Sequence, residues 1–417
     1  MTITDSRTRW LALIVLCLGD LMIVLDTTIV NVALPSIRED LRFSETSLAW
    51  VVNAYLLTFG GFLLLGGRLG DLFGHRRLFL IGIALFTAAS LACGLAGSQA
   101  FLVGARAVQG LGAAVFALCL VLLPASRGPA AAGRLDVAGA VTVTAALMLA
   151  VYAIVNANET GWTSGRTLAL LAAAAVLLAL FLGIETRARS PLMPLGLFRL
   201  RNVATANVVG VLWAGAMFAW FFLSALYLQL VLGYSPLHVG LAFLPANLIM
   251  GAFSLGLSAK LVLRLGFRTP LATGLLLSAI GLVLFARAPV DGSFAIDVLP
   301  SMILLGFGAG MAFNPVLLAA MSDVDQSEAG LASGVVNTSF MMGGALGLAV
   351  LASLAASRSD NLLASGDGPL VALNGGYHLA FLVGAAFAVA AAVVGAVLLR
   401  TRAPQPAATT EALPLEV

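Results

Sequence analysis

The sequence predicts an all-α membrane protein with about twelve spanning helices. Apolar residues make up 61% of the 417 positions, and 44 glycines come in addition to them. A soluble domain has about 45–50% apolar residues with glycine included, and roughly 25% charged residues. Here only 10% of the residues are charged. So few charged side chains cannot cover so much apolar surface in water, which excludes a soluble fold.

A series of long apolar runs accounts for this composition. A helix needs about 20 mostly apolar residues to cross the hydrocarbon core of a bilayer. Runs of this length fall near residues 10–34, 48–67, 78–97, 101–123, 136–156, 166–184, 203–229, 239–262, 270–288, 298–320, 330–355 and 377–399. The first run is too long for the core of a signal peptide, and no small-residue cleavage site follows it. We therefore expect it to be retained as the first span.

The basic residues predict the orientation of the chain. Most of the 22 lysine and arginine residues lie at ends of apolar runs that face the cytoplasm if the N-terminus is cytoplasmic. We expect a multi-pass protein of the cell membrane with both termini in the cytoplasm. A net charge of +3 distributed in this way indicates topology and not a nucleic-acid-binding surface.

A polar stretch divides the apolar runs into two equal sets. We expect residues 1–184 to form an N-terminal half, 185–202 a cytoplasmic linker, 203–400 a C-terminal half and 401–417 a disordered tail. A weak internal repeat supports two halves, because the sequence at 69–76 after the second span resembles that at 261–268 after the eighth. Parallel repeats of six helices are a known plan of secondary transporters.

Two acidic residues, Asp20 and Asp26, lie inside the first apolar run. An acidic residue at the centre of a spanning helix costs about 2.5–3.5 kcal/mol on insertion scales, so such residues are mostly functional. Burial disfavours the charged form of a carboxyl group, which lets the group exchange a proton near neutral pH. Each acid is therefore a candidate proton-coupling site. The alternative is that it only hydrogen-bonds to a neighbouring helix or to water.

Arg106 lies inside the fourth apolar run, and Gln109 follows one turn later on the same helix face. An arginine at this depth needs an acceptor or an aqueous cavity. Pairing with an acid of the first span would hold that acid ionised until substrate or a proton competes. The alternative is an end residue whose side chain extends to the membrane surface.

Asp71, Arg76 and Arg77 lie at the predicted cytoplasmic end of the second span. An exposed pair of this kind is usually worth less than about 1 kcal/mol. The acidic residues before the eleventh span are Asp323, Asp325 and Glu328. Ion pairs between the two groups that form in only one conformation would act as a latch.

No enzyme signature is present. The three histidines are far apart, and the zinc motif HExxH, the phosphate-binding motif GxxxxGK[ST] and the lipase motif GxSxG are all missing. The three cysteines lie inside apolar runs, which indicates neither a disulfide framework nor a zinc site. We therefore expect no enzyme, no metal and no cofactor. Without a nucleotide-binding loop, an ion gradient is the expected energy source.

Several strings carry a family resemblance: 25–35 (LDTTIVNVALP), 50–57 (WVVNAYLL), 67–77 (GRLGDLFGHRR), 106–114 (RAVQGLGAA), 227–236 (YLQLVLGYSP) and 329–338 (AGLASGVVNT). Together they resemble the drug–proton antiporters with fourteen helices, a branch of the major facilitator superfamily. The resemblance covers nearly the whole chain. It identifies the third string with the cytoplasmic gating motif and the fourth with a helix tied to proton coupling.

The chain departs from this branch in its first half. Leu72 and His75 stand where the gating motif usually has basic residues, and the glycine–proline motif of the family's fifth helix is missing. Residues 116–127 resemble the end of the family's sixth helix, and 134–139 the start of its two extra central helices. This alignment implies the loss of family helices five and six. The spans at 136–156 and 166–184 then either complete a six-plus-six bundle or leave it incomplete.

The resemblance implies a major-facilitator-type bundle in two halves, and a monomeric exporter in the lipid bilayer that moves small amphipathic compounds outward as protons enter. The residues that it assigns to proton and substrate coupling are Asp26, Asp20, Arg106, Gln109 and Asn31. The gating motif comprises Gly67, Asp71, Gly74, Arg76 and Arg77. The alternative is a non-transporting or degenerate membrane protein, derived from such an exporter by loss of a helix pair.

Overall fold

The computed structural model describes residues 6–121, 136–188, 191–325 and 328–400. Within these ranges the regular structure is entirely helical. Twelve helical segments of the described chain are long and apolar enough to cross a membrane. The predicted fold class, an all-α membrane protein with about twelve spans, is confirmed. The predicted disordered tail at 401–417 lies outside the described residues.

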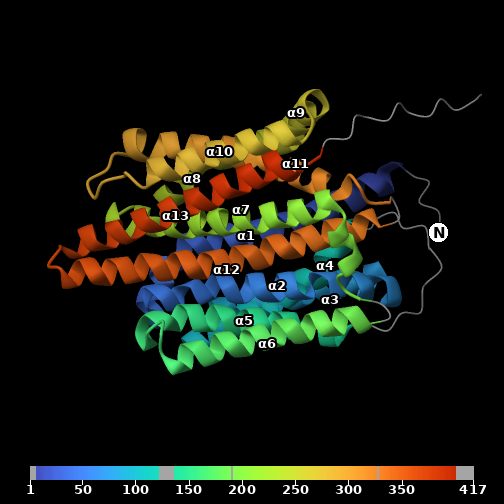
Figure 1. Ribbon diagram of the computed structural model, residues 1–417, viewed down its shortest axis with the longest axis horizontal. Coiled ribbons are helices and arrows are strands. Elements are labelled where there is room, and N and C mark those ends of the chain that lie inside the picture. The colour runs from blue at the N-terminus through green and yellow to red at the C-terminus, as the bar shows by residue number, and fades with distance from the viewer. Residues whose placement is uncertain (1–5, 122–135, 189–190, 326–327, 401–417) are drawn as a thin grey trace, which may run out of the picture.

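The helices run side by side along the long axis of the molecule (Figure 1). The first part of the chain forms α1 (Ser6–Leu41), α2 (Glu45–Phe73), α3 (His75–Gly94), α4 (Gln99–Val121), α5 (Val137–Thr160) and α6 (Gly165–Arg187). The second part forms the 3-10 turn η1 (Leu195–Arg199), α7 (Arg201–Leu226), α8 (Pro236–Ala252), α9 (Ser258–Leu265), α10 (Arg268–Phe285), α11 (Leu299–Met321), α12 (Ala329–Ala364) and α13 (Pro369–Leu398). Three π-helical turns are η2 (Tyr227–Val231), η3 (Phe253–Leu257) and η4 (Phe294–Val298).

Two spans differ in shape from the apolar runs that predict them. The eighth span continues from α8 through η3 into α9, and it bends at Gly256, whose φ is 119°. Helix α12 has 36 residues and is therefore about 54 Å long, which exceeds the hydrocarbon thickness of about 30 Å. The helix continues past the apolar run through the polar residues at 357–361, which lengthens it beyond the predicted end at 355.

Both halves repeat one packing plan. In the first half α4 packs against α2 and α3, and in the second half α11 packs against α8 and α10. The turn between the second and third spans of each half contains a glycine with positive φ, namely Gly74 at 91° and Gly266 at 70°. The sequence repeat at 69–76 and 261–268 thus corresponds to the same turn in both halves.

The repeat breaks down at the first helix of each half. Helix α7 packs against α12 and α13, whereas α5 and α6 pack mainly against each other, and α5 also contacts α12 and α2. Figure 1 shows α5 and α6 at one edge of the bundle, on the side opposite α10. In the most apolar window of the span Arg201–Val231, 67% of the residues are buried, but only 17% are buried in that of Leu21–Leu41, the described span of α1. The pair α5–α6 therefore does not complete a six-helix bundle around α1.

Helix α5 touches both halves, but in different ways. On α12, the backbone carbonyl of Ser353 accepts a hydrogen bond from Asn158 Nδ2 at 2.9 Å, and Ser353 Oγ donates to the Ile154 carbonyl at 3.3 Å. On α2, Gly61 lies directly against Thr144. No hydrogen bond joins α5 to α2 among the described residues. The direct contact between the two halves is mainly that of α2 with α12.

Replacing Gly347 by leucine will destabilise the second half of the protein. A Cβ at Gly347 of α12 would overlap the backbone of Gly215 on α7, and overpacking of this kind costs about 1–3 kcal/mol. We expect a lower midpoint of thermal unfolding for the purified protein, followed by circular dichroism. The control Gly183→Leu adds the same side chain to α6, where a Cβ meets open space. Equal midpoints for the two variants would contradict this packing.

Candidate functional site

Three polar side chains meet between α1 and α4. Asp26 of α1 and Arg106 of α4 form an ion pair, with Arg106 Nη1 at 2.6 Å from Asp26 Oδ2. Gln109 Nε2 donates to the other carboxylate oxygen, Asp26 Oδ1, at 2.7 Å. Arg106 Nη1 also donates to Gln109 Oε1 at 2.7 Å. Each of the three side chains therefore touches the other two, and together they form a closed ring of hydrogen bonds, which we call the polar ring.

Helix α2 fixes the guanidinium from the other side. Arg106 Nε donates to the backbone carbonyl of Val51 at 2.9 Å, and Arg106 Cζ lies 4.6 Å from the centroid of the Tyr55 ring. The close approach of α2 and α4 depends on Gly110, where a Cβ would lie 2.5 Å from the Tyr55 carbonyl oxygen. Arg106 is only 1% exposed, so the protein itself must supply acceptors for its donors.

Asp26 is the most accessible member of the ion pair. Its side chain is 12% exposed, against 2% for that of Arg106. It lines a cavity of about 390 Å³ between α1 and α3, together with Phe86 and Ser90. The carboxylate of Asp26 therefore borders open space on this side, whereas the guanidinium is enclosed by protein.

Three contributors to the site were missed by sequence reasoning. Val51 acts through its backbone carbonyl, which carries no signal in the sequence. Tyr55 lies in the string 50–57 that resembles the family, but its position beneath the guanidinium depends on the rotation of α2. Cys93 Sγ lies 3.7 Å from Gln109 Oε1 and donates to it, although it stands in an apolar run without any polar motif.

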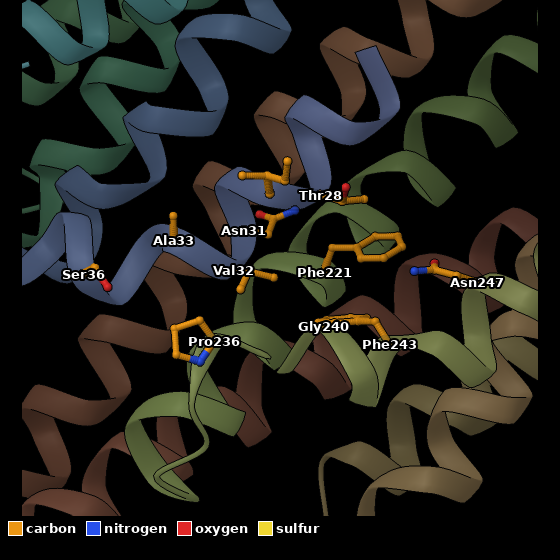
Figure 2. A pocket seen from close by; sticks show the side chains of 11 residues that line it. Thr28, Asn31, Val32, Ala33, Ser36, Phe221, Pro236, Gly240, Phe243 and Asn247 are labelled. Atoms are coloured by element: carbon orange, nitrogen blue, oxygen red, sulfur yellow. The ribbon is translucent and has the colours of Figure 1, made fainter. Parts of the chain in front are cut away.

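A second cavity, of about 490 Å³, lies between α1, α7 and α8 (Figure 2). Helix α1 contributes Thr28 and Asn31, α7 contributes Phe221, and α8 contributes Phe243 and Asn247. The rings of Phe221 and Phe243 stack with centroids 5.5 Å apart and an interplanar angle of 25°. In this view the Phe221 ring lies between the two asparagines (Figure 2).

The structure does not bring all of the predicted coupling residues together. Asn31 lines the second cavity, and its Nδ2 donates to the Thr27 carbonyl at 3.0 Å. It is therefore separate from the polar ring, which contains Asp26. The side chain of Asp20, six residues earlier in α1, lies outside the described part of the structure.

The predicted gating motif lies at the junction of α2 and α3. Gly74 separates the two helices, and Arg76 and Arg77 are exposed in the first turn of α3. The surroundings of Gly67 and the side chain of Asp71 lie outside the described part. Within the described residues, the two arginines form no ion pair with the acidic residues Asp323, Asp325 and Glu328. The latch that the sequence suggests is thus not formed in this conformation.

Comparisons with known proteins agree with this architecture. Residues 16–348 match the model of the Major Facilitator Superfamily. The puromycin resistance protein pur8 of Streptomyces alboniger is 35% identical over 94% of this chain and 91% of its own length. The cephamycin export protein CmcT of Amycolatopsis lactamdurans is 35% identical over 95% of this chain and 93% of its own.

Solved structures show the same fold at low identity. The crystal structure of a bacterial homolog to the human lysosomal transporter Spinster, in an inward-facing and occupied conformation, superposes with a TM-score of 0.64. The match covers 94% of this chain and 97% of that chain at 15% identity.

The polar ring predicts strong energetic coupling between Asp26 and Arg106. Removing one partner of a buried ion pair costs about 3–5 kcal/mol, because the other charge stays behind without compensation. In a double-mutant cycle of Asp26→Asn and Arg106→Gln, measured by thermal unfolding, we expect a coupling of about 1–3 kcal/mol. The control cycle pairs Asp26→Asn with Arg166→Gln near the start of α6 and should be additive. Additivity in the first cycle would contradict the ion pair.

Proposed function

The chain belongs to the major facilitator superfamily, and we propose that it exports small amphipathic compounds from the cell in exchange for protons. It is a secondary transporter and not an enzyme. Two relatives at 35% identity are named for puromycin resistance and for cephamycin export, which supports export as the direction of transport. The observation that carries proton exchange is the polar ring between α1 and α4.

In this proposal Asp26 binds the proton. As a carboxylate it accepts hydrogen bonds from Arg106 and Gln109, which hold α1 against α4. Protonation removes the negative charge that balances the guanidinium. Arg106 then keeps its contacts with the Val51 carbonyl and the Tyr55 ring, so α4 stays attached to α2 while α1 is released. A proton that crosses the membrane supplies about 2.3 kcal/mol per 100 mV of potential.

We assign the other predicted residues to supporting roles. Asp20 is a second candidate proton site on α1, and Asn31 contacts cargo in the cavity between α1, α7 and α8. The gating motif around Asp71, Arg76 and Arg77 closes the cytoplasmic side by pairing with the acidic residues before α12. The exposed position of both arginines supports a role that depends on conformation.

We further propose that the protein is a monomer of the cell membrane with cytoplasmic termini, and that it derives from the fourteen-helix branch by loss of helices five and six. The alignment with pur8 spans 462 positions, 45 more than the 417 residues of the whole chain. The alignment therefore contains at least this many positions that this chain does not fill, which in total is enough for two spans of about 20 residues each. Few residues in the described span of α1 are buried, because no pair of helices packs against it as α12 and α13 pack against α7. This poor cover of α1 supports the same interpretation.

The poor cover of α1 also favours a second candidate function. A chain without two helices of its first half would still insert, because removing a pair keeps every later loop on its side of the membrane. Such a protein would be a non-transporting derivative of an exporter. The two candidates differ in whether proton flux follows substrate flux.

Asp26→Asn will abolish proton-coupled efflux. In liposomes that contain the purified protein and an internal pH dye, puromycin or cephamycin added under a pH gradient should cause proton movement with the wild type. We expect at least about a hundredfold lower rate for Asp26→Asn, since loss of a proton-transfer group typically removes a factor of 10²–10⁴.

The control for this experiment is Asp360→Asn, which removes an exposed carboxylate near the end of α12 and should keep the wild-type rate. If neither compound causes proton movement with the wild type, and its traces match those of Asp26→Asn, the non-transporting derivative is favoured instead.

A further inference from the structure

Helix α8 is covered much less than its counterpart in the first half. By the packing plan that both halves share, α8 corresponds to α2. Helix α2 packs against α12 of the opposite half, and its span is buried over 89% of the most apolar window. The span that contains α8 is buried over only 28% of its window, and α1 is the main first-half neighbour of α8 among the described residues. One side of α8 therefore has no equivalent of α12 packed against it.

Exposed leucines mark this uncovered side. In α8 they lie three or four residues apart, which places them on one side of the helix, and they are Leu237, Leu241, Leu244 and Leu248. Beyond α8 the apolar surface continues through Leu255, which is 92% exposed, to Leu263 of α9, which is 87% exposed. We call these six residues the leucine stripe.

Three cations lie where the leucine stripe ends. Lys260 and Arg264 are four residues apart in α9 and share one face of it. Arg268 begins α10 directly after the turn at Gly266. All three side chains are exposed. Figure 1 shows α9 at the edge of the bundle, close to one end of the helices. Apolar surface and positive charge therefore meet at this corner of the protein.

The three cations have no acidic partner in the described structure. Residues 186–290 contain no aspartate or glutamate. Helix α11 packs against α9 and is followed by Asp323 and Asp325, but neither of these forms an ion pair with the cations among the described residues. In the sequence repeat, Leu263 occupies the position that Asp71 has in the first half. The positive charge of this turn is therefore left for a partner outside the chain to balance.

We infer that α8 and α9 bind an anionic phospholipid. Its phosphate would accept charge-assisted hydrogen bonds from Lys260, Arg264 and Arg268, and its acyl chains would lie along Leu255 and Leu263. A soluble anion would balance the cations but leave the leucines uncovered. A second copy of the chain, docked through the same face, would bring three more cations to the same place. The inference goes beyond the proposed function, because it concerns neither the cargo nor the proton.

The test is native mass spectrometry of the full-length protein in detergent. The probes are phosphatidylglycerol and phosphatidylcholine with the same palmitoyl and oleoyl chains, and we expect phosphatidylglycerol to bind more tightly. The double variant Lys260→Gln/Arg264→Gln should raise the Kd of phosphatidylglycerol about thirtyfold, since each cation contributes roughly a factor of five. The matched control Arg287→Gln/Arg358→Gln removes two exposed arginines near the C-terminal ends of α10 and α12 and should keep the wild-type Kd.

A second pair of variants tests the contact with the acyl chains. Leu263→Ser removes apolar surface beside the cations, and we expect it to raise the Kd of phosphatidylglycerol about threefold or more. The control Leu237→Ser, at the other end of the leucine stripe, should leave the Kd unchanged. All of these side chains are exposed, so the thermal midpoints should stay those of the wild type.

Four results would each overturn the inference. They are equal Kd values for the two lipids, equal effects of the two double variants, equal affinity for glycerol phosphate, which has the headgroup without the chains, and a dimer that phosphatidylglycerol does not dissociate. Because lipid binding is measured without cargo or a gradient, its outcome is independent of whether proton-coupled efflux is observed.

Discussion

A guanidinium that is 1% exposed inside a membrane protein needs acceptors for its donors and a balance for its charge. In this protein α1, α2 and α4 meet these needs together. The Val51 carbonyl, the Tyr55 ring and the polar ring leave Arg106 little room to rearrange. The positions of three helices in the first half therefore depend on one arginine. The negative charge that balances this guanidinium comes from Asp26, whose side chain is more exposed than that of Arg106.

This arrangement holds α1 in an unusual way. Helix α2 is buried over 89% of its most apolar window, whereas α1 is buried over 17%. Packing thus fixes α2. Helix α1 packs against α2, α4, α7 and α8, and its described residues are hydrogen-bonded to α4 and, at the Val32 carbonyl, to Gln229 Nε2 of the second half at 3.0 Å. A helix with so few buried residues in its described span is sensitive to the charge state of the carboxyl group that joins it to α4. This sensitivity would suit the coupling role proposed for Asp26.

Much of the fold was predictable because bilayer thickness sets the length of each span. The proximity of Arg106 and Gln109 was also predictable, since helix geometry places residues three apart on one face. The pairing of Arg106 with Asp26 was one of two options, because a single sequence does not give the rotation of α1. Helix geometry does explain the separate position of Asn31, as five residues correspond to about 140° around the axis.

Other features were beyond the sequence for physical reasons. The spans at 136–156 and 166–184 have the length and composition of any membrane helix, and nothing in their periodicity identifies the neighbours of α5 and α6. The backbone carbonyl of Val51 is chemically the same as every other carbonyl in the chain. The cavity between α1, α7 and α8 depends on the packing of two halves that lie far apart in the sequence.

The two contacts of α5 have a consequence for any rocking motion of the protein. A helix that touches α2 in one half and α12 in the other cannot stay rigidly attached to both while the halves rotate. Ser353 bonds α12 to α5 through both its carbonyl and its hydroxyl, whereas the Thr144 side chain seats against Gly61 of α2 by packing alone. If the halves rotate, the contact without hydrogen bonds is the easier one to break. The hairpin of α5 and α6 would then stay with the second half, although the chain encodes it with the first.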